Sequence, residues 1–339
     1  MNENPSAAPS IDRPATRVAL WDNVKFVMII LMTVGHFVDA FEDTSHTCRS
    51  IYLYVYAFHM PLFIFISGLF YSEKNKTRKI VYYVLCGFAL KLILAIMNLL
   101  IYHSTEFTLL GDSGFPWFMF ALAAFQALMY LCRDINKSFL FVFNIILACF
   151  VGYDQSVGDY LYLSRIVVFF PVFLLGTMVN QKAIIAFIKK HYKVLLPLSI
   201  LVLALWFYLC FFKLDHFYIY RHLFTARKPF SKKVIGYGPL ARLLCYFITF
   251  TTGFSILVIF PKEKIPLVTS LGARTLNVFI WHWPFYQILS VYFGIKNLFA
   301  MSLWGKVAFV LIPVMLSLLL MSIKLFDYPL KWIKKYVNA

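Results

Sequence analysis

An apolar stretch near the N-terminus, DNVKFVMIILMTVGHF at residues 22–37, contains three side chains that could exchange protons or hold an anion. They are Asp22, Lys25 and His36. On an α-helix, Lys25 and His36 lie within roughly 20° of the same face and about 16 Å apart along the axis. Asp22 falls within about 40° of the His36 direction. The spacing therefore predicts one polar stripe of acid, base and imidazole along an otherwise apolar helix.

Such a stripe needs an explanation, because an ionisable side chain inside a membrane span costs at least a few kcal/mol. Lys25 lies close to the predicted helix start, so snorkelling of its ammonium group to the interface explains it by itself. His36 is too deep for that and needs a partner or a water-filled cavity. Imidazole titrates near neutral pH, which suits a general base.

The overall composition places these residues in a membrane protein. The 339 residues are 61% hydrophobic and 14% charged, a ratio that a soluble domain could not cover with polar surface. Several apolar runs exceed the roughly 20 residues needed to cross a bilayer. The net charge of +17 is then assigned to cytosolic loops rather than to nucleic-acid binding. The six cysteines are scattered and predict neither a disulfide framework nor a metal site.

The sequence thus predicts an all-α integral membrane protein, a bundle of about ten transmembrane helices. Basic residues concentrate in alternate loops, which favours both termini in the cytosol. Residues 1–17 are predicted to be a cytosolic tail leading into an uncleaved first helix, residues 18–327 a single transmembrane domain, and residues 328–339 a cytosolic C-terminal tail. The predicted spans lie near residues 18–40, 51–71, 80–102, 115–132, 138–153, 160–181, 193–212, 239–260, 266–293 and 303–326.

The predicted outer loop at residues 213–238 breaks this charge rule. One interpretation is a miscounted helix or an interfacial segment that lies on anionic lipid. The other is an external platform for a sugar or an acidic polymer, in which aromatic faces contact pyranose rings. The basic residues of the loop are Lys213, Arg221, Arg227, Lys228, Lys232 and Lys233.

Two further spans contain ionisable side chains beside a proline. In FHMPLFIFISGLF, His59 either bonds to a neighbouring helix or lines a cavity, and Pro61 frees a backbone carbonyl. In LSRIVVFFPVFLLG, Arg165 lies at the estimated depth of His36. Because arginine keeps its charge, Arg165 either snorkels outward or faces an interior anion. A base and a fixed cation at one level would suit proton removal while an oxyanion develops.

The ninth span, SLGARTLNVFIWHWP, adds Arg274 and His282. Arg274 is interpreted as an anchor at the inner face, with phosphate binding as the alternative. A structural role and a substrate-lining role are equally consistent with His282, which stands between two tryptophans. Trp117 and Arg242 are weaker candidates, and contacts within the bundle explain them most simply.

Together these stretches resemble the type 3 acyltransferases, multi-pass enzymes that O-acylate extracytoplasmic glycans. Lys25 and His36, with ten residues between them, are similar to the family's Arg/Lys-x10-His motif. HMPLFIFISG, GFPWF, SRIVVFFPVFLLG and LGARTLNVFIWH resemble its later motifs in the family's order. The similarity is greatest to the fucose 4-O-acetylase-like branch. The sequence has no counterpart of the hydrolase-like domain of the fused members.

The resemblance implies that cytosolic acyl-CoA, usually acetyl-CoA, acts as co-substrate and that a hydroxyl of an extracytoplasmic glycan or polysaccharide is the acceptor. It matches His36 to the essential histidine, Lys25 to its basic partner and Arg165 to the sixth-helix arginine. We predict His36 as general base and Arg165 as oxyanion stabiliser, with a covalent acyl-histidine route as the alternative. The predicted location is the plasma or inner membrane, with no metal and no permanently bound cofactor. The predicted donor- and substrate-binding residues are Asp22, Lys25, His59, Trp117, Arg242, Arg274 and His282.

The phosphates of CoA cannot enter hydrocarbon cheaply, so they should stay at the inner mouth. The axial distance of about 16 Å from Lys25 to His36 is of the order of the reach of the pantetheine arm. The candidate residues for the mouth are Lys25, Arg78, Lys79 and Arg274.

Two non-enzymatic classes remain as alternatives. A transporter or exporter of a glycan or lipid-linked sugar would use His36, His59 and Arg165 as a proton or anion pathway. A structural or sensor protein explains the composition but not the alignment of Lys25 with His36.

Overall fold

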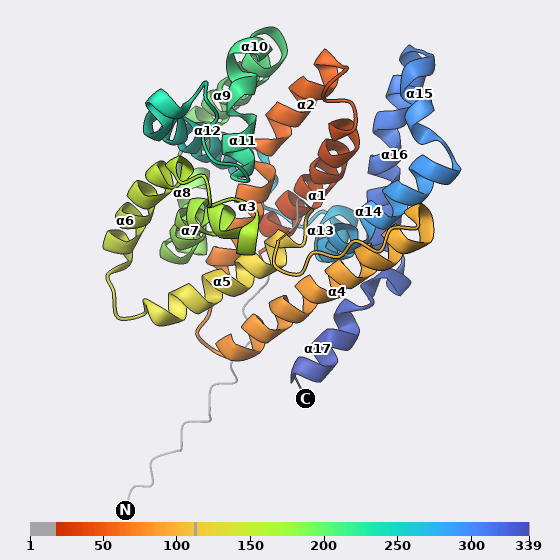
Figure 1. Ribbon diagram of the computed structural model, residues 1–339. Helices are drawn as coiled ribbons and strands as arrows, with labels where there is room; N and C mark the ends of the chain where they lie inside the picture. The colour runs from red at the N-terminus through yellow and green to blue at the C-terminus, as the bar shows by residue number, and fades with distance from the viewer. Residues whose placement is uncertain (1–17, 112–113, 339) are drawn as a thin grey trace, which may run out of the picture.

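The computed structural model describes residues 18–111 and 114–338, and the predicted tail at residues 1–17 lies outside these. Throughout the described part of the chain, every regular element is a helix (Figure 1). The α-helices are α1 (Ala19–Asp39), α2 (His46–Tyr56), α3 (His59–Leu69), α4 (Lys76–Tyr102), α5 (Trp117–Leu131), α6 (Lys137–Phe150), α7 (Leu163–Met178), α8 (Gln181–Lys190), α9 (Tyr192–Phe212), α10 (Leu214–Phe217), α11 (Arg221–Thr225), α12 (Gly238–Ile259), α13 (Pro266–Gly272), α14 (Thr275–Tyr292), α15 (Ile295–Met301), α16 (Leu303–Ser322) and α17 (Leu330–Asn338). The 3-10 turns are η1 (Val151–Tyr153), η2 (Tyr160–Tyr162), η3 (Tyr218–Tyr220), η4 (Ile235–Tyr237) and η5 (Lys324–Asp327).

Seven helical segments within the described residues are long and apolar enough to cross a membrane. They are α1, α2 with α3, α4, η2 with α7, α9, η4 with α12, and α16. α5 and α6 are apolar but shorter, and α14 is not among the seven. The prediction of an all-helical fold with several helices able to span a membrane is confirmed for the described residues. A count of ten spans and the cytosolic location of both termini stay predictions.

Helix α1 lies at the centre of the bundle, in contact with α2, α3, α13, α14 and α16. It is continuous from Ala19 to Asp39, so Lys25 and His36 keep the axial separation of about 16 Å that their spacing predicts. α13 approaches α1 closely at Gly272. A Cβ atom there would lie 2.0 Å from the carbonyl oxygen of Asp22, so only glycine fits.

The predicted second span, residues 51–71, is two helices rather than one. The chain breaks between α2 and α3, four residues before Pro61, which stands in the first turn of α3, where its missing N–H costs little. The carbonyl group of Ala57 therefore has no helical donor. It accepts a hydrogen bond from the Thr249 hydroxyl of α12 at 2.8 Å. The freed carbonyl that the sequence predicts is thus satisfied by a side chain of another helix.

Two other predicted segments also differ from the structure. The predicted ninth span, residues 266–293, is divided into α13 and α14 by a turn. The predicted loop at residues 213–238 contains α10, η3, α11 and η4. Phe230 fixes its return path, because its N–H donates to the carbonyl of Gly152 at 2.7 Å. Its ring fills the space where Gly152 and Gly238 lack a side chain.

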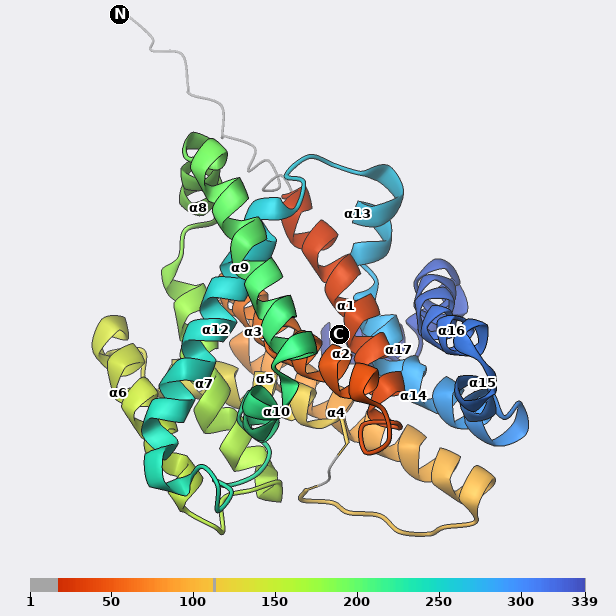
Figure 2. The same cartoon turned by 90° about the horizontal axis from the view of Figure 1, so that it is seen from above.

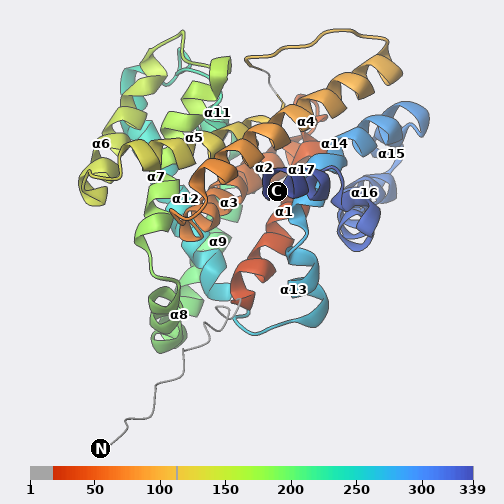
Figure 3. The same cartoon turned by 90° about the horizontal axis from the view of Figure 1, so that it is seen from below.

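The elements divide between two ends of the bundle. Figure 2 shows α8 and α13 at the end where α1 begins, which we call the N-terminal end, and α10 toward the opposite end. The last helix, α17, packs on α4 (Figures 1 and 3). Because some helices begin and others finish at each end of the bundle, side chains from the first turn of one helix lie near side chains from the last turn of another.

Candidate active site

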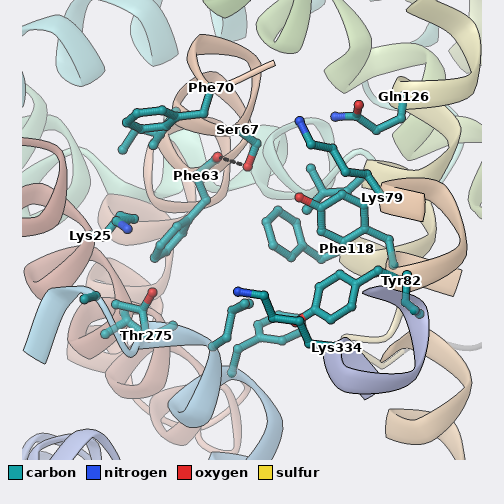
Figure 4. A pocket seen from close by; sticks show the side chains of 18 of the residues that line it. Lys25, Phe63, Ser67, Phe70, Lys79, Tyr82, Phe118, Gln126, Thr275 and Lys334 are labelled. Carbon is teal, nitrogen blue, oxygen red and sulfur yellow. Dashed lines mark hydrogen bonds between the residues drawn. The ribbon is translucent and has the colours of Figure 1, made fainter. Parts of the chain in front are cut away.

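A cavity of about 530 Å³ opens toward the N-terminal end of the bundle. Residues near the starts of α1, α4 and α14, together with the end of α3, line it. Its charged lining is entirely basic among the described residues: Lys25, Arg78, Lys79 and Lys334. In Figure 4 the side chains of Lys25, Lys79 and Lys334 surround one open space from different sides. We call this space the lysine cavity.

The Lys25 ammonium group is positioned by an acid on its own helix. Asp22 lies one turn earlier and contacts the Lys25 Nζ atom at 2.9 Å. Asp22 is only 2% exposed and does not itself line the cavity. The interior of the cavity is largely apolar and aromatic, with Phe63 and Phe118 on its wall. Cations at the mouth and aromatic rings within suit a ligand with an anionic head and a less polar arm.

A second cavity, of about 640 Å³, lies toward the other end of α1 and is called here the histidine cavity. Four residues that the sequence singles out line it together, from α1, α3, α5 and α7: His36, His59, Trp117 and Arg165. Its charged lining is mixed. The acidic members are Asp39, Glu42 and Glu106, and the basic members are Lys91, Arg165, Arg227 and Lys228.

His36 lies in an aromatic setting within this cavity. Its Nδ1 atom is 3.3 Å from the hydroxyl of Tyr56 in α2. The ring of His282 in α14 lies with its centroid 5.2 Å from that of His36. Phe115 and Trp283 each lie 6.2 Å away by the same measure. The packing of α2, α14 and the residues before α5 around α1 therefore brings His36 next to residues that are distant in the sequence.

The other two imidazoles have a defined proton position. The Nδ1 atom of His59 lies 2.9 Å from the carbonyl oxygen of Val55, and that of His282 lies 2.9 Å from the carbonyl oxygen of Val278. Since a carbonyl only accepts hydrogen bonds, each Nδ1 carries the proton and each Nε2 of the neutral ring is an acceptor. The Nε2 atom of His282 is buried and has no hydrogen-bond partner among the described residues.

Arg165 is held in place by a ring and a carboxylate. Its guanidinium carbon lies 4.8 Å from the centroid of the Trp117 ring, and the side chain is 6% exposed. A terminal nitrogen lies 3.8 Å from one oxygen of Asp159. The other oxygen of Asp159 accepts a hydrogen bond from Arg227 Nε at 2.8 Å. One carboxylate thereby links two cations that face the histidine cavity.

The two cavities share part of their walls. Met60 of α3 and Phe279 of α14 line both. Lys25 on one side and His36 on the other belong to the same helix, about 16 Å apart. Met60 and Phe279 therefore lie between the lysine cavity and the cavity that contains His36.

Four of the predicted binding residues line neither cavity: Asp22, Arg242, Arg274 and His282. Arg242 is 2% exposed and donates to the carbonyl oxygen of Leu223 at 2.5 Å. Arg274 contacts Asp327 at 2.7 Å and donates to the carbonyl oxygens at residues 322 and 323. In the structure both arginines connect chain segments, and their predicted substrate contacts stay predictions. His282 packs on His36 but is not part of the cavity lining.

Sequence reasoning overlooked several residues that line the cavities. Asp39 follows His36 by three positions on α1 and extends the polar stripe, so the helical period alone could have indicated it. Tyr56 precedes His59 by three residues and was hidden by the break between α2 and α3. Lys334 belongs to a short basic segment at the C-terminus, and no sequence signal connects it to α1.

The segment at residues 222–228 also reaches the histidine cavity. His222, Phe224, Thr225, Arg227 and Lys228 line it, whereas Lys232 and Lys233 do not. Burial, reinforced by the positive charges of Arg221, Lys228 and Arg227, lowers the pKa of His222 to about 4. His222 is therefore neutral at pH 7, and the positive charge of this segment at the cavity comes from Arg227 and Lys228.

The fold and these cavities define a multi-helix membrane protein with histidine and arginine side chains gathered in its interior. The sequence profile of the acyltransferase domain, type 3, matches residues 18–323. The chain therefore belongs to the type 3 acyltransferase family, as the motifs around Lys25 and His36 predict. No curated protein and no solved structure matches the chain. The family indicates an acyltransferase that acts at a membrane, and the transporter alternative receives no support.

Proposed function

We propose that this protein transfers an acyl group, most simply acetyl, from cytosolic acyl-CoA to a hydroxyl of an extracytoplasmic glycan or polysaccharide. The observation that carries the proposal is the pair of adjoining cavities, one basic and one containing His36, that share Met60 and Phe279. The fucose 4-O-acetylase-like branch and a plasma or inner membrane location fit this activity. With the lysine cavity at the cytosolic face, both chain termini would be cytosolic.

The donor would bind with its phosphates at the lysine cavity. Lys25, Arg78 and Lys79 line that cavity, and their charges would replace the water lost by the phosphates. The pantetheine arm would pass between Met60 and Phe279 and bring the thioester carbonyl to His36. Arg274, bound to Asp327, would support this mouth without touching the donor.

The acceptor hydroxyl would lose its proton to His36. If Nδ1–H donates to the Tyr56 hydroxyl oxygen, at 3.3 Å, the lone pair on Nε2 is available as the base. The acceptor oxygen attacks the thioester carbonyl, the C–S bond breaks as the tetrahedral intermediate collapses, and the proton passes from His36 to the CoA thiolate. The step is balanced without any further reactant.

Arg165 would stabilise the oxyanion of this intermediate. Its guanidinium group lines the same cavity as His36 and is fixed on the Trp117 ring. A buried cation that is already in position interacts strongly with a charge that develops only in the transition state. His59, which lines this cavity and has an acceptor nitrogen, would orient a hydroxyl group of the acceptor near His36, and His282 would support the His36 ring from behind.

A reconstituted vesicle assay tests the proposal. Purified protein in vesicles receives radiolabelled acetyl-CoA on one side and a panel of glycans on the other, and label incorporated into glycan is counted. We expect transfer by the parent and about a 100- to 10,000-fold lower kcat for His36→Gln. His103→Gln, a change outside both cavities, is the matched control. Transfer at the parental rate by His36→Gln would refute the role of His36 as base.

A further inference from the structure

The helix α17 lies beyond the matched acyltransferase domain, which ends at residue 323. Nevertheless Lys334 and Val337 of α17 form part of the lysine cavity. Figure 4 shows the Lys334 side chain reaching into the space that Lys25 and Lys79 also face. A segment outside the family domain thus completes the wall of a cavity inside it.

Buried apolar side chains on one face of α17 fix the position of this helix. Leu330 and Ile333 are buried, at 8% and 4% exposure, and the helix packs on α4. On the other side Trp332 and Tyr336 are exposed, and their rings lie 4.8 Å apart. Exposed tryptophan and tyrosine side chains on a basic helix suit the membrane interface. Lys334 is therefore held at the level of the cavity mouth.

A carboxylate before α17 ties the segment to the domain. Asp327 accepts hydrogen bonds from Arg274 and Asn277, both at 2.7 Å, and pairs with Lys331 at 2.6 Å. Partial burial alone would raise the pKa of Asp327, but the hydrogen bonds from Lys331, Asn277 and Arg274 outweigh it and lower the pKa. The contact therefore persists at neutral pH. It gives Arg274 a function as a positioning residue for α17.

Lys334 differs from the neighbouring lysines in its ion pairing. Lys25 is paired with Asp22, and Lys331 is paired with Asp327. Among the described residues no carboxylate pairs with Lys334, and no acidic side chain lines the lysine cavity. The ammonium group of Lys334 thus adds an uncompensated positive charge to a partly enclosed, apolar space. Such a charge favours a phosphate group as its ligand.

We propose that Lys334 binds a phosphate of the donor nucleotide, so that the C-terminal segment, residues 324–338, completes the donor site. This inference rests on the proposed function, because it takes acyl-CoA as the donor. It goes beyond the family domain, since the contact comes from a residue outside it. Lys334 then selects for nucleotide-bearing donors over simple thioesters, while the acyl group and the acceptor are recognised in the histidine cavity.

The test compares Lys334→Gln with Lys335→Gln, a matched loss of charge one position later on the same helix and outside the cavity lining. Each variant is assayed with acetyl-CoA and with S-acetyl-pantetheine, which lacks the nucleotide and its phosphates. We expect Lys334→Gln to raise the KM for acetyl-CoA about three- to tenfold, as for loss of one solvent-screened ionic contact. Its KM for S-acetyl-pantetheine and its kcat should not change, and Lys335→Gln should resemble the parent.

Four results would overturn the inference. Equal acetyl-CoA KM values for the two variants would show that Lys334 does not contact the donor. Equal KM increases for both donors would assign Lys334 to helix packing or to lipid phosphates. Calorimetric titration of the parent with CoA distinguishes this inference from the proposed function. If the parent does not bind CoA, both the inference and the proposed function are refuted. If the parent and Lys334→Gln bind CoA equally, only the role of Lys334 is refuted.

Discussion

The two cavities meet at Met60 and Phe279 but differ in the charge of their walls. The lysine cavity has four basic and no acidic residues among its described lining, and an apolar interior. The histidine cavity mixes acids with bases and gathers polar groups from α1, α2, α3, α4, α5 and α7 and from the 222–228 segment. A wall of one sign suits a ligand of fixed opposite charge, such as a nucleotide. A mixed wall suits a neutral or varied acceptor, and it also supplies the groups for proton transfer.

This contrast predicts that substitutions in the histidine cavity alter catalysis and that substitutions in the lysine cavity alter donor binding. The sharpest test after His36 is Arg165→Lys, which keeps the charge but loses the planar group that packs on Trp117. We expect kcat to fall about 100-fold, because the cation is displaced from the oxyanion. CoA affinity, measured by calorimetry, should stay at the parental value. A loss of CoA affinity equal to the loss of kcat would erase the distinction between the cavities.

The shared wall can be changed without touching either set of charges. Phe279→Trp adds volume where a pantetheine arm would pass, whereas Phe279→Leu removes volume and keeps the apolar character. We expect Trp to lower kcat about tenfold, as for a misplaced reacting group. Leu should leave kcat within about twofold of the parent. Fluorescence-detected size exclusion checks that both variants fold, and similar kcat values for both would exclude this route for the thioester.

The acceptor side gives a smaller expected effect. Lys228 lines the histidine cavity and Lys232, four residues later in the same segment, does not. If the acceptor is acidic, Lys228→Gln should raise the acceptor KM about threefold to tenfold and leave the acetyl-CoA KM unchanged. Lys232→Gln is the control and should act as the parent. Identical acceptor kinetics for both variants would favour the alternative in which the whole segment contacts lipid.

The reach of sequence-based prediction depends on whether a residue's partners lie on its own helix. Lys25 and His36 share α1, so the helical period by itself determines their common face and their separation. Pro61 indicates a free carbonyl for a similar local reason. The other residues that line the two cavities could not be predicted in this way, because they depend on which helices pack together.

Arg274 and Lys334 illustrate that limit. The sequence predicts Arg274 as an anchor or a phosphate ligand, and its contact with Asp327, 53 positions later, becomes visible only in the structure. Lys334 belongs to a basic segment that was expected to be a cytosolic tail, and packing of α17 on α4 brings it to the lysine cavity. Contacts between such distant segments leave no period in the sequence, so spacing arguments miss them.

The smallest expected effect is on the free energy of unfolding. It tests the burial of the 222–228 segment separately from the rest of the histidine cavity. His222 has a pKa of about 4 when folded and about 6.5 when unfolded, so the unfolded chain binds a proton first as the pH falls. The free energy of unfolding therefore has its full value above about pH 6.5, where His222 is neutral in both states. It decreases progressively between about pH 6.5 and pH 4, where only the unfolded chain binds the proton. With partial exposure we expect a loss of about 1 kcal/mol. His222→Gln, followed by thermal unfolding in detergent across that range, should remove this part of the pH dependence. His216→Gln, a histidine outside both cavities, should keep it, and equal slopes for the two variants would show that His222 is not buried against Arg221 and Arg227.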